Sequence, residues 1–187
     1  MAKMITIDEQ RCLACKACVI ECALAHSAAG SLAKALENGE PLQARVHVEA
    51  VGQFGMPLQC RHCTDAPCVA VCPAEAVSRR SQDAPVLLDE DRCIGCGLCM
   101  LVCPFGVIDM SRTGKGVVKC DLCIARTAMG EPPACVSACP TGALKYEEIE
   151  QWLARRRKQA AEGLRAAGAV AGPGKSSENE DGPDQGR

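Results

Sequence analysis

The sequence predicts a small α+β protein in which a run of cysteines followed by a short β-hairpin is repeated four times. Two observations support this prediction. The 187 residues include 16 cysteines, and these fall into four runs of four. Short stretches with alternating apolar and polar residues, such as residues 45–51, stand between the runs and indicate strands. The four aromatic residues are too few to anchor an ordinary core, so we expect bound inorganic centres to hold the fold.

The third run shows what these centres are. From Cys93 to Pro104 it reads C-x2-C-x2-C-x3-C-P, the spacing with which bacterial proteins bind a 4Fe–4S cluster. Three thiolates two residues apart, on a loop eased by Gly95 and Gly97, can hold three corners of one cube. The fourth cysteine begins a new segment, and in two-cluster proteins it binds the other cluster. The third run therefore predicts a partner run.

The other three runs keep this order of three cysteines plus one. The first reads C-x2-C-x2-C-x3-C and is followed by Ala23, so its helix can continue to His26. The second reads C-x2-C-x4-C-x3-C-P, and the fourth has eleven residues between its second and third cysteines.

The exchange of the last cysteine predicts how the runs pair. The second and third runs are adjacent and should form one compact two-cluster unit, while the first and fourth pair around the outside. We therefore expect four clusters with these ligands: Cys12, Cys15, Cys18 and Cys139 (cluster 1); Cys60, Cys63, Cys68 and Cys103 (cluster 2); Cys72, Cys93, Cys96 and Cys99 (cluster 3); Cys22, Cys120, Cys123 and Cys135 (cluster 4). If neighbouring runs paired instead, Cys22 would lie near the first three cysteines of the second run.

The expected organisation is a nested, tandem set of ferredoxin-like 4Fe–4S domains in two pseudo-symmetric two-cluster units. The four motifs occupy residues 2–30, 50–82, 83–112 and 115–147, followed by a helix over residues 148–165 and a disordered tail over residues 168–187. Hairpin strands are expected at residues 76–79 with 85–89 and at residues 106–110 with 116–119, and an exit strand at residues 141–146.

Disulfides and zinc are the competing uses of so many cysteines. The N-terminus shows no secretory signal and the chain has no apolar stretch of about 20 residues, so we expect a reducing, cytoplasmic setting without disulfides. Zinc takes two Cys pairs from separate places, and four cysteines packed as x2, x2, x3 suit a cube better. A zinc-stabilised interaction scaffold remains the alternative.

Charge and the remaining motifs bear on the partners. Formal net charge is −2, and four clusters at −2 each would take it to about −10, so partners should offer basic docking surfaces rather than nucleic acid.

Residues 169–176 match a relaxed phosphate loop, but no strand precedes them and no helix follows, so no nucleotide site is expected. The basic residues 155–158 fit a solvated helix face better than a nucleic-acid or membrane site, and docking of a partner subunit is a further interpretation. Since no flavin or nicotinamide site is evident, the chain is expected to be non-catalytic.

Several motifs together resemble a known family. They are Cys60-Arg-His-Cys63 with Ala66-Pro67-Cys68, the exits Cys72-Pro73 and Cys103-Pro104-Phe105-Gly106, and Lys119-Cys120-Asp-Leu-Cys123. With these residues the chain resembles the four-cluster ferredoxin-like electron-transfer subunits of molybdopterin oxidoreductases, hydrogenases and carbon monoxide dehydrogenases.

The resemblance implies a function and partners. The chain would relay electrons between the catalytic subunit of a cytoplasmic oxidoreductase and a second redox partner. The stretches Cys12–Cys18 and Cys22–Ser27 are similar to the carbon monoxide dehydrogenase iron–sulfur subunit in particular. A free-standing polyferredoxin that shuttles between enzymes is the second hypothesis.

Overall fold

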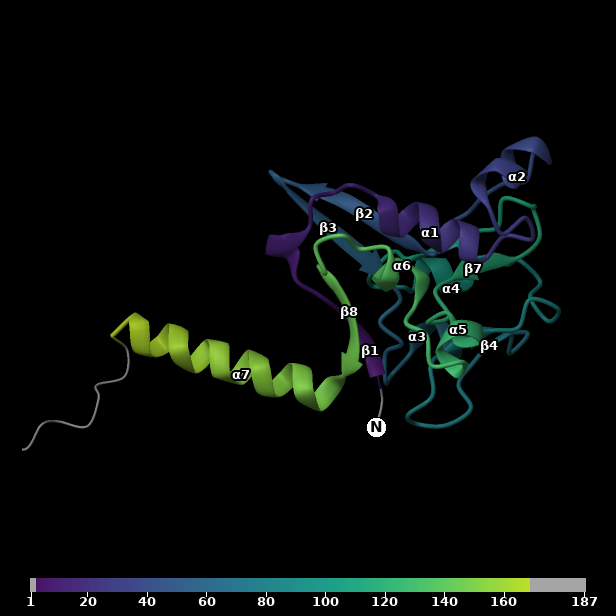
Figure 1. Cartoon of the computed structure of the whole chain (residues 1–187). Coiled ribbons are helices and arrows are strands. Elements are labelled where there is room, and N and C mark those ends of the chain that lie inside the picture. Colours follow the sequence, from purple (N-terminus) through teal and green to yellow (C-terminus); the bar gives the residue numbers. More distant parts are fainter. Residues whose placement is uncertain (1–2, 169–187) are drawn as a thin grey trace, which may run out of the picture. The chain divides into compact units, whose positions relative to one another are not determined.

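The strands pair as four separate two-stranded antiparallel sheets, shown with the short helices around them in Figure 1. The computed structural model describes residues 3–168, so the predicted disordered tail lies outside the described residues except for Gly168, and the phosphate-loop-like residues 169–176 lie outside them entirely. The strands are β1 (Lys3–Ile7), β2 (Val46–Val51), β3 (Phe54–Gln59), β4 (Val77–Ser78), β5 (Leu87–Leu88), β6 (Ile108–Met110), β7 (Val117–Lys119) and β8 (Leu144–Glu148). The helical elements are η1 (Glu9–Arg11), α1 (Ala17–Ala25), α2 (Leu32–Glu37), α3 (Pro67–Ala70), α4 (Leu98–Leu101), α5 (Ile124–Ala128), α6 (Ala134–Ser137) and α7 (Ile149–Ala166). This is the mixed α/β fold of small size that the sequence predicts.

The chain divides into two units, residues 1–149 and residues 150–187. The second unit contains α7 from Glu150 onward, and within it the guanidinium of Arg156 lies over the Trp152 ring at 5.8 Å from its centroid. None of the described helices is long and apolar enough to cross a bilayer. All the cysteines belong to the first unit.

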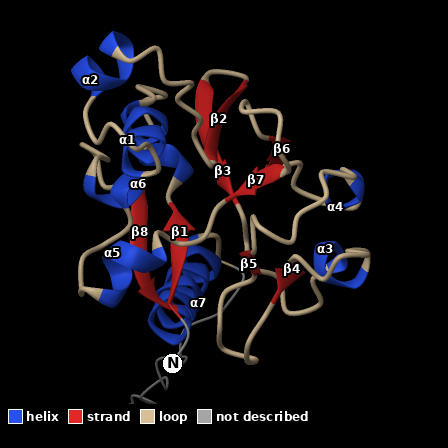
Figure 2. Ribbon diagram, turned by 90° about the vertical axis from the view of Figure 1, so that its right-hand side faces the viewer, coloured by secondary structure: helices blue, strands red, loops and turns tan. Residues whose placement is uncertain are grey.

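The two ends of the first unit meet in one sheet. Strands β1 and β8 pair antiparallel, with Ile5 opposite Tyr146 and Ile7 opposite Leu144. Ile5 and Leu144 are both buried, so the pairing closes over an apolar core. Helix α1 also contacts α6. Within the first unit, Figure 2 shows β1, β8, α1 and α6 on one side and β4, β5, α3 and α4 on the other. The first and fourth cysteine runs are thereby brought together.

Two of the hairpins lie where the sequence pattern predicts them. Strand β4 pairs with β5, and β6 pairs with β7. The exit strand β8 begins at Leu144, inside the expected range.

The structure contains several elements that the sequence pattern does not predict, among them strand β3 and helix α2. Strand β3 pairs with β2, although it carries Gly55 and Pro57, both unfavourable in strands. Gly55 is required because a Cβ atom there would lie 2.7 Å from the Cβ of Ala14, in the first cysteine loop. The first turn of α2 is capped by the Ser31 hydroxyl accepting from the Lys34 backbone N–H at 3.4 Å.

Two small cores hold the first unit, and cysteines make up much of each. One combines Ile5, Val46, Leu122 and Leu144 with cysteines of the first and fourth runs. The other combines four aliphatic residues from the two hairpins with cysteines of the second and third runs. Because so few large apolar side chains are buried, the cysteine sites must contribute much of the stability.

Candidate iron–sulfur centres

All sixteen cysteines lie within the described residues, and all sixteen are free of disulfides. The structure brings them together in four sets, each combining the first three cysteines of one run with the last cysteine of another. The sets are set 1 (Cys12, Cys15, Cys18, Cys139), set 2 (Cys60, Cys63, Cys68, Cys103), set 3 (Cys72, Cys93, Cys96, Cys99) and set 4 (Cys22, Cys120, Cys123, Cys135). Each group contains the four cysteines that the sequence assigns to one cluster, and their role as cluster ligands stays a prediction.

Sets 1, 2 and 3 each line a small cavity whose remaining walls are largely apolar. Val86 and Ile108 line the set 2 cavity, Val48 and Leu144 line that of set 1, and Val117 lines that of set 3. Such walls limit access of water to whatever the thiols hold.

Set 4 is the most deeply placed. Its four cysteines are all buried, and Cys135 is close enough to Cys22, Cys120 and Cys123 for its pKa to respond to their charges. Helix α1 supplies Cys22, and α6 supplies Cys135.

One backbone feature recurs in all four runs. In each Cys-x-x-Cys loop the residue directly before the second cysteine has a positive φ: 53° at Ala14, 48° at His62, 69° at Gly95 and 59° at Leu122. The left-handed conformation is unfavourable for the three residues other than glycine, so the loop geometry is imposed at a cost of about 1 kcal/mol or more each.

Backbone N–H groups point at sulfur atoms. The amide of Arg45 donates to Cys22 Sγ at 3.2 Å, that of His62 to Cys60 Sγ at 3.4 Å, and that of Leu122 to Cys120 Sγ at 3.5 Å. Such hydrogen bonds stabilise thiolates more than thiols, because the thiolate is the stronger acceptor. The loops are therefore built for sulfur in its metal-binding form.

When no metal is bound, burial opposes the formation of thiolates and so raises the pKa of the thiols. It raises the pKa of Cys18 to about 11 and that of Cys120 to about 12. Cys139 differs: burial raises its pKa, but hydrogen bonds from the Leu144 amide and the Thr141 hydroxyl outweigh this effect and lower it. Metal binding to these sets must therefore displace protons, which couples metal loading to pH.

A partly buried ionic network supports set 4. Asp121 accepts hydrogen bonds from His26 Nε2 at 3.1 Å, Arg45 Nη1 at 3.0 Å and the Cys123 amide at 2.9 Å. His26 Nδ1 donates in turn to the backbone carbonyl of Cys22 at 2.7 Å. Burial opposes ionisation of Asp121, but the His26 hydrogen bond and the Arg45 charge outweigh it and lower the pKa to about 2. The network ties the first run to the fourth beside two cysteines of set 4.

His62 and Lys119 lie beside set 2. His62 Nδ1 accepts from the Val86 amide at 3.1 Å, and its other ring nitrogen is buried without a hydrogen-bond partner. Burial, and then the charge of Lys119, lower the pKa of His62 to about 3, so its ring is neutral. Arg79 braces the same loop by donating to the backbone carbonyls of His62 and Cys63.

The spacing of the sulfur atoms bears on the choice between a cluster and a zinc ion. Four sulfurs at about 2.3 Å from one tetrahedral zinc lie about 3.8 Å apart. Within residues 3–168, the one group of three potential ligands whose ligand atoms all lie within 4.8 Å is His26, Asp121 and Cys123, in which His26 and Asp121 are already hydrogen-bonded to each other. None of the four cysteine sets forms such a close group within residues 3–168, which does not favour a single zinc ion. Three thiols of one run combined with the last thiol of another fit a 4Fe–4S cube.

Comparison with known proteins agrees with this geometry. A family model described as a 4Fe-4S dicluster domain matches residues 51–149, and a 4Fe-4S binding domain matches residues 9–25. An "Iron-sulfur protein" of Rhodospirillum rubrum is 40% identical over 172 residues, covering 85% of this chain and 90% of the relative. The putative electron transport protein YsaA of Escherichia coli is 37% identical, covering 85% of this chain and 98% of the relative. The thiosulfate reductase electron transfer subunit PhsB of Salmonella typhi is also 37% identical, covering 80% of this chain and 80% of the relative.

The chain therefore belongs to the family of iron–sulfur electron-transfer subunits of oxidoreductases. These relatives support the family as a whole and do not single out the carbon monoxide dehydrogenase branch that the first run resembles.

Proposed function

We propose that the chain binds four 4Fe–4S clusters, one in each set, and relays electrons between a catalytic oxidoreductase subunit and a second redox partner without catalysing a reaction itself. The observation that carries this proposal is the gathering of all sixteen cysteines into four three-plus-one sets. Each cluster, when bound, accepts and releases one electron. The residues that would hold the clusters are the sixteen cysteines already assigned to sets 1 to 4.

Electrostatic interactions between cysteines of different sets give the order of the sets. The thiol of Cys18 in set 1 acts on that of Cys135 in set 4, and Cys60 in set 2 acts on Cys120 in set 4. Cys68 of set 2 packs in the same core as Cys99 of set 3 and acts on its pKa. The sets therefore follow one another as set 1, set 4, set 2 and set 3, a continuous row that suits passage of electrons from one end to the other.

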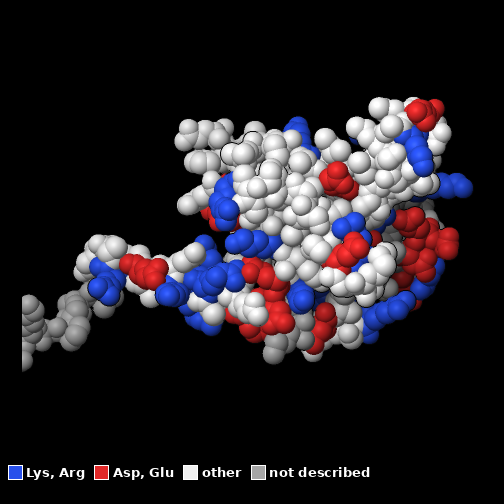
Figure 3. Space-filling view, in the orientation of Figure 1, with Lys and Arg blue, Asp and Glu red and all other residues white. Residues whose placement is uncertain are grey.

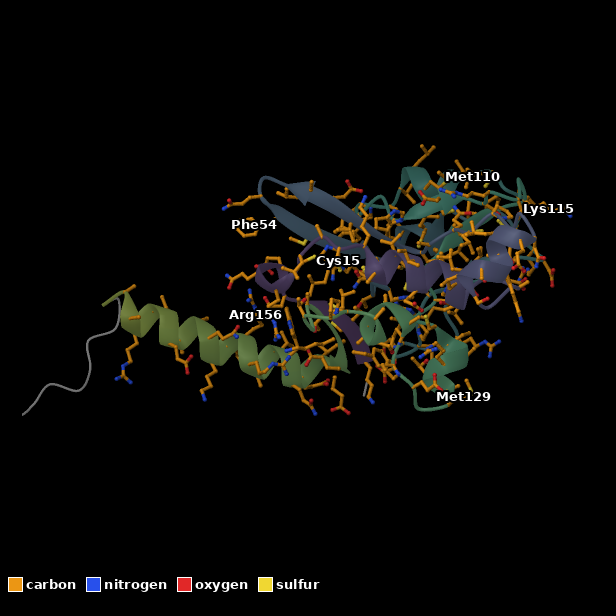
Figure 4. All side chains as sticks on the ribbon, turned by 45° about the horizontal axis from the view of Figure 1, so that its top comes forward. Cys15, Phe54, Met110, Lys115, Met129 and Arg156 are labelled. Atoms are coloured by element: carbon orange, nitrogen blue, oxygen red, sulfur yellow. The ribbon has the colours of Figure 1, made fainter. Side chains whose placement is uncertain are left out.

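The two ends of this row reach the surface. Cys15 of set 1 and Cys96 of set 3 are the two exposed cysteines among the sixteen. Exposed apolar side chains accompany each end: Leu13 and Phe54 come with Cys15, and Ile94 lies two residues before Cys96. Figure 4 shows Cys15 and Phe54 at the same end of the first unit, and Figure 3 shows a largely uncharged surface over α1 and the β2–β3 hairpin. We infer that electrons enter and leave at sets 1 and 3, with partners docking at these two ends.

A cytoplasmic location completes the proposal, because thiols that must stay reduced to bind iron suit a reducing compartment. The alternative of a free-standing shuttle differs from a permanent subunit in its stoichiometry. Untagged protein purified without oxygen from its native cell should emerge with one partner in a fixed ratio if it is a subunit, and alone if it is a shuttle.

The electron-carrying capacity tests the function itself. Stepwise reduction of the anaerobic protein, followed by its visible absorbance, should take up about four electrons per chain, one for each cluster. Uptake of no electrons would leave only a structural role for the cysteines and would end the proposal.

A further inference from the structure

Lys119 is a buried lysine in the middle of the row of cysteine sets. It ends strand β7, directly precedes Cys120, and is only 2% exposed. Its Nζ atom donates hydrogen bonds to the backbone carbonyl of Cys120 at 2.9 Å and to the backbone carbonyl of Val86. Lysine is among the residues least often buried without an opposite charge.

Nothing among its hydrogen-bond partners balances that charge. Both acceptors are neutral carbonyls, and within the part of the chain that the structure describes Lys119 makes no ion pair with a carboxylate. Moving an ammonium group out of water is strongly unfavourable unless a counter-charge is close by. An anion other than an ion-paired carboxylate of residues 3–168 is therefore expected near Lys119.

The position of Lys119 identifies that anion, because it lies between two cysteine sets. Toward set 4, it bonds the carbonyl of Cys120, a member of that set. Toward set 2, it bonds Val86, which lines the set 2 cavity and whose amide donates to His62 in the same wall. The charge of Lys119 also acts on Cys68, opposing the rise in the thiol pKa that burial causes.

The lysines beside the outer sets in residues 3–168 differ from Lys119 in their exposure. Lys16, next to Cys15 of set 1, and Lys115, which precedes the Gly116 that contacts Cys93 of set 3, are both exposed to solvent. Their charges are screened by water, whereas the charge of Lys119 acts through the protein interior.

We propose that the Lys119 ammonium is the counter-charge shared by the centres in sets 2 and 4. Its charge raises the reduction potentials of both centres relative to those in sets 1 and 3. The inference rests on the proposed function, since it requires anionic clusters in those two sets. Reduction adds one negative charge to a centre, and a buried cation beside it stabilises that reduced form.

Three substitutions separate charge from packing. Lys119→Gln removes the charge and keeps an N–H₂ group that can donate to both carbonyls, Lys119→Met removes charge and donors, and Lys119→Arg keeps the charge. The matched control is Lys145→Gln on the exposed face of β8. Each anaerobic full-length variant is assayed for iron and then titrated with reductant at pH 7, with the reduced clusters followed by EPR.

In Lys119→Gln we expect two of the four signals to require a potential lower by at least 59 mV, the shift that corresponds to a tenfold change for one electron. The other two signals should stay in place, and Lys119→Arg and Lys145→Gln should match the unaltered protein. Iron loss from the Gln and Met variants but not from Arg would also support the inference, because it would show that the charge is needed for loading. Unchanged potentials in a fully loaded Gln variant, equal shifts of all four signals, or iron loss from all three variants would overturn it. The iron content and electron uptake of the unaltered protein test the proposed function separately.

Discussion

Replacing Asp121 by Asn removes the charge at the centre of the network beside set 4. In the unaltered protein the Asp121 carboxylate accepts three hydrogen bonds, from His26, Arg45 and the Cys123 amide, at 3.1, 3.0 and 2.9 Å. The side-chain carbonyl oxygen of Asn can still accept from the Cys123 amide. Its N–H₂ group then faces the donors of His26 and Arg45 and cannot accept from them. Two charge-assisted hydrogen bonds at about 1.5–3 kcal/mol each are lost. Because the Asp121 side chain is 22% exposed, we take the lower end and expect a loss of about 3 kcal/mol.

The assay is anaerobic unfolding in urea, followed by the visible absorbance of the clusters. With a slope of about 1–3 kcal/mol per molar urea, a loss of about 3 kcal/mol lowers the midpoint by about 1–3 M. Asp109→Asn is the matched control, because Asp109 pairs with His47 at 3.5 Å and its side chain is 43% exposed, so its loss should be below about 1 kcal/mol. If Asp121→Asn shifted the midpoint no more than Asp109→Asn does, the network would have no role in holding set 4 together.

Three further predictions concern the cysteine sets and the core. Cys22→Ser and Cys135→Ser should each lose the same EPR signal and up to about four iron atoms, since both cysteines are placed in set 4; loss of two different signals would break the assignment. Gly116→Ala should destabilise the protein by about 2 kcal/mol or more, because its φ is +69° and the new Cβ would lie 3.0 Å from the sulfur of Cys93, whereas Gly114→Ala, at φ +77° in open space, should cost about 1 kcal/mol by the same urea assay. Leu144→Ala should cost about 2–4 kcal/mol, because the side chain is fully buried between the first and last strands, and a loss below about 1 kcal/mol would show that this core does not matter.

Much of the fold follows from the cysteine spacing. The exchange of the last cysteine between runs implies that the first and fourth runs meet, and the pairing of β1 with β8 brings them together. The β4–β5 and β6–β7 hairpins follow from alternating residues with turn sequences between them. These features depend on local pattern and ligand geometry, which a sequence displays directly.

Other features depend on contacts that no local pattern displays. Strand β3 carries Gly55 because the first cysteine loop lies against it, a contact between residues about forty positions apart. The left-handed residue in each Cys-x-x-Cys loop is signalled by glycine only at Gly95; at Ala14, His62 and Leu122 the sulfur geometry overrides residue preference.

The contacts of the polar residues around set 4 also could not be predicted from the sequence. His26 follows Cys22 by four residues and so shares its helix face, which could have marked it as a neighbour of that cysteine. Its partner Asp121 is 95 positions away, and the pairing depends on α1 meeting the fourth run. In the sequence Lys119 is a lysine at the end of a predicted hairpin, like many exposed lysines. Its burial in the structure is what distinguishes it from them.

The most direct test of the whole account is a count of iron and acid-labile sulfide in protein purified without oxygen. Four cubes in sets 1 to 4 predict about 16 iron atoms and about 16 sulfides per chain in a brown preparation. A colourless protein that contains zinc and no sulfide would contradict the central claim that these sixteen cysteines hold electron-carrying clusters.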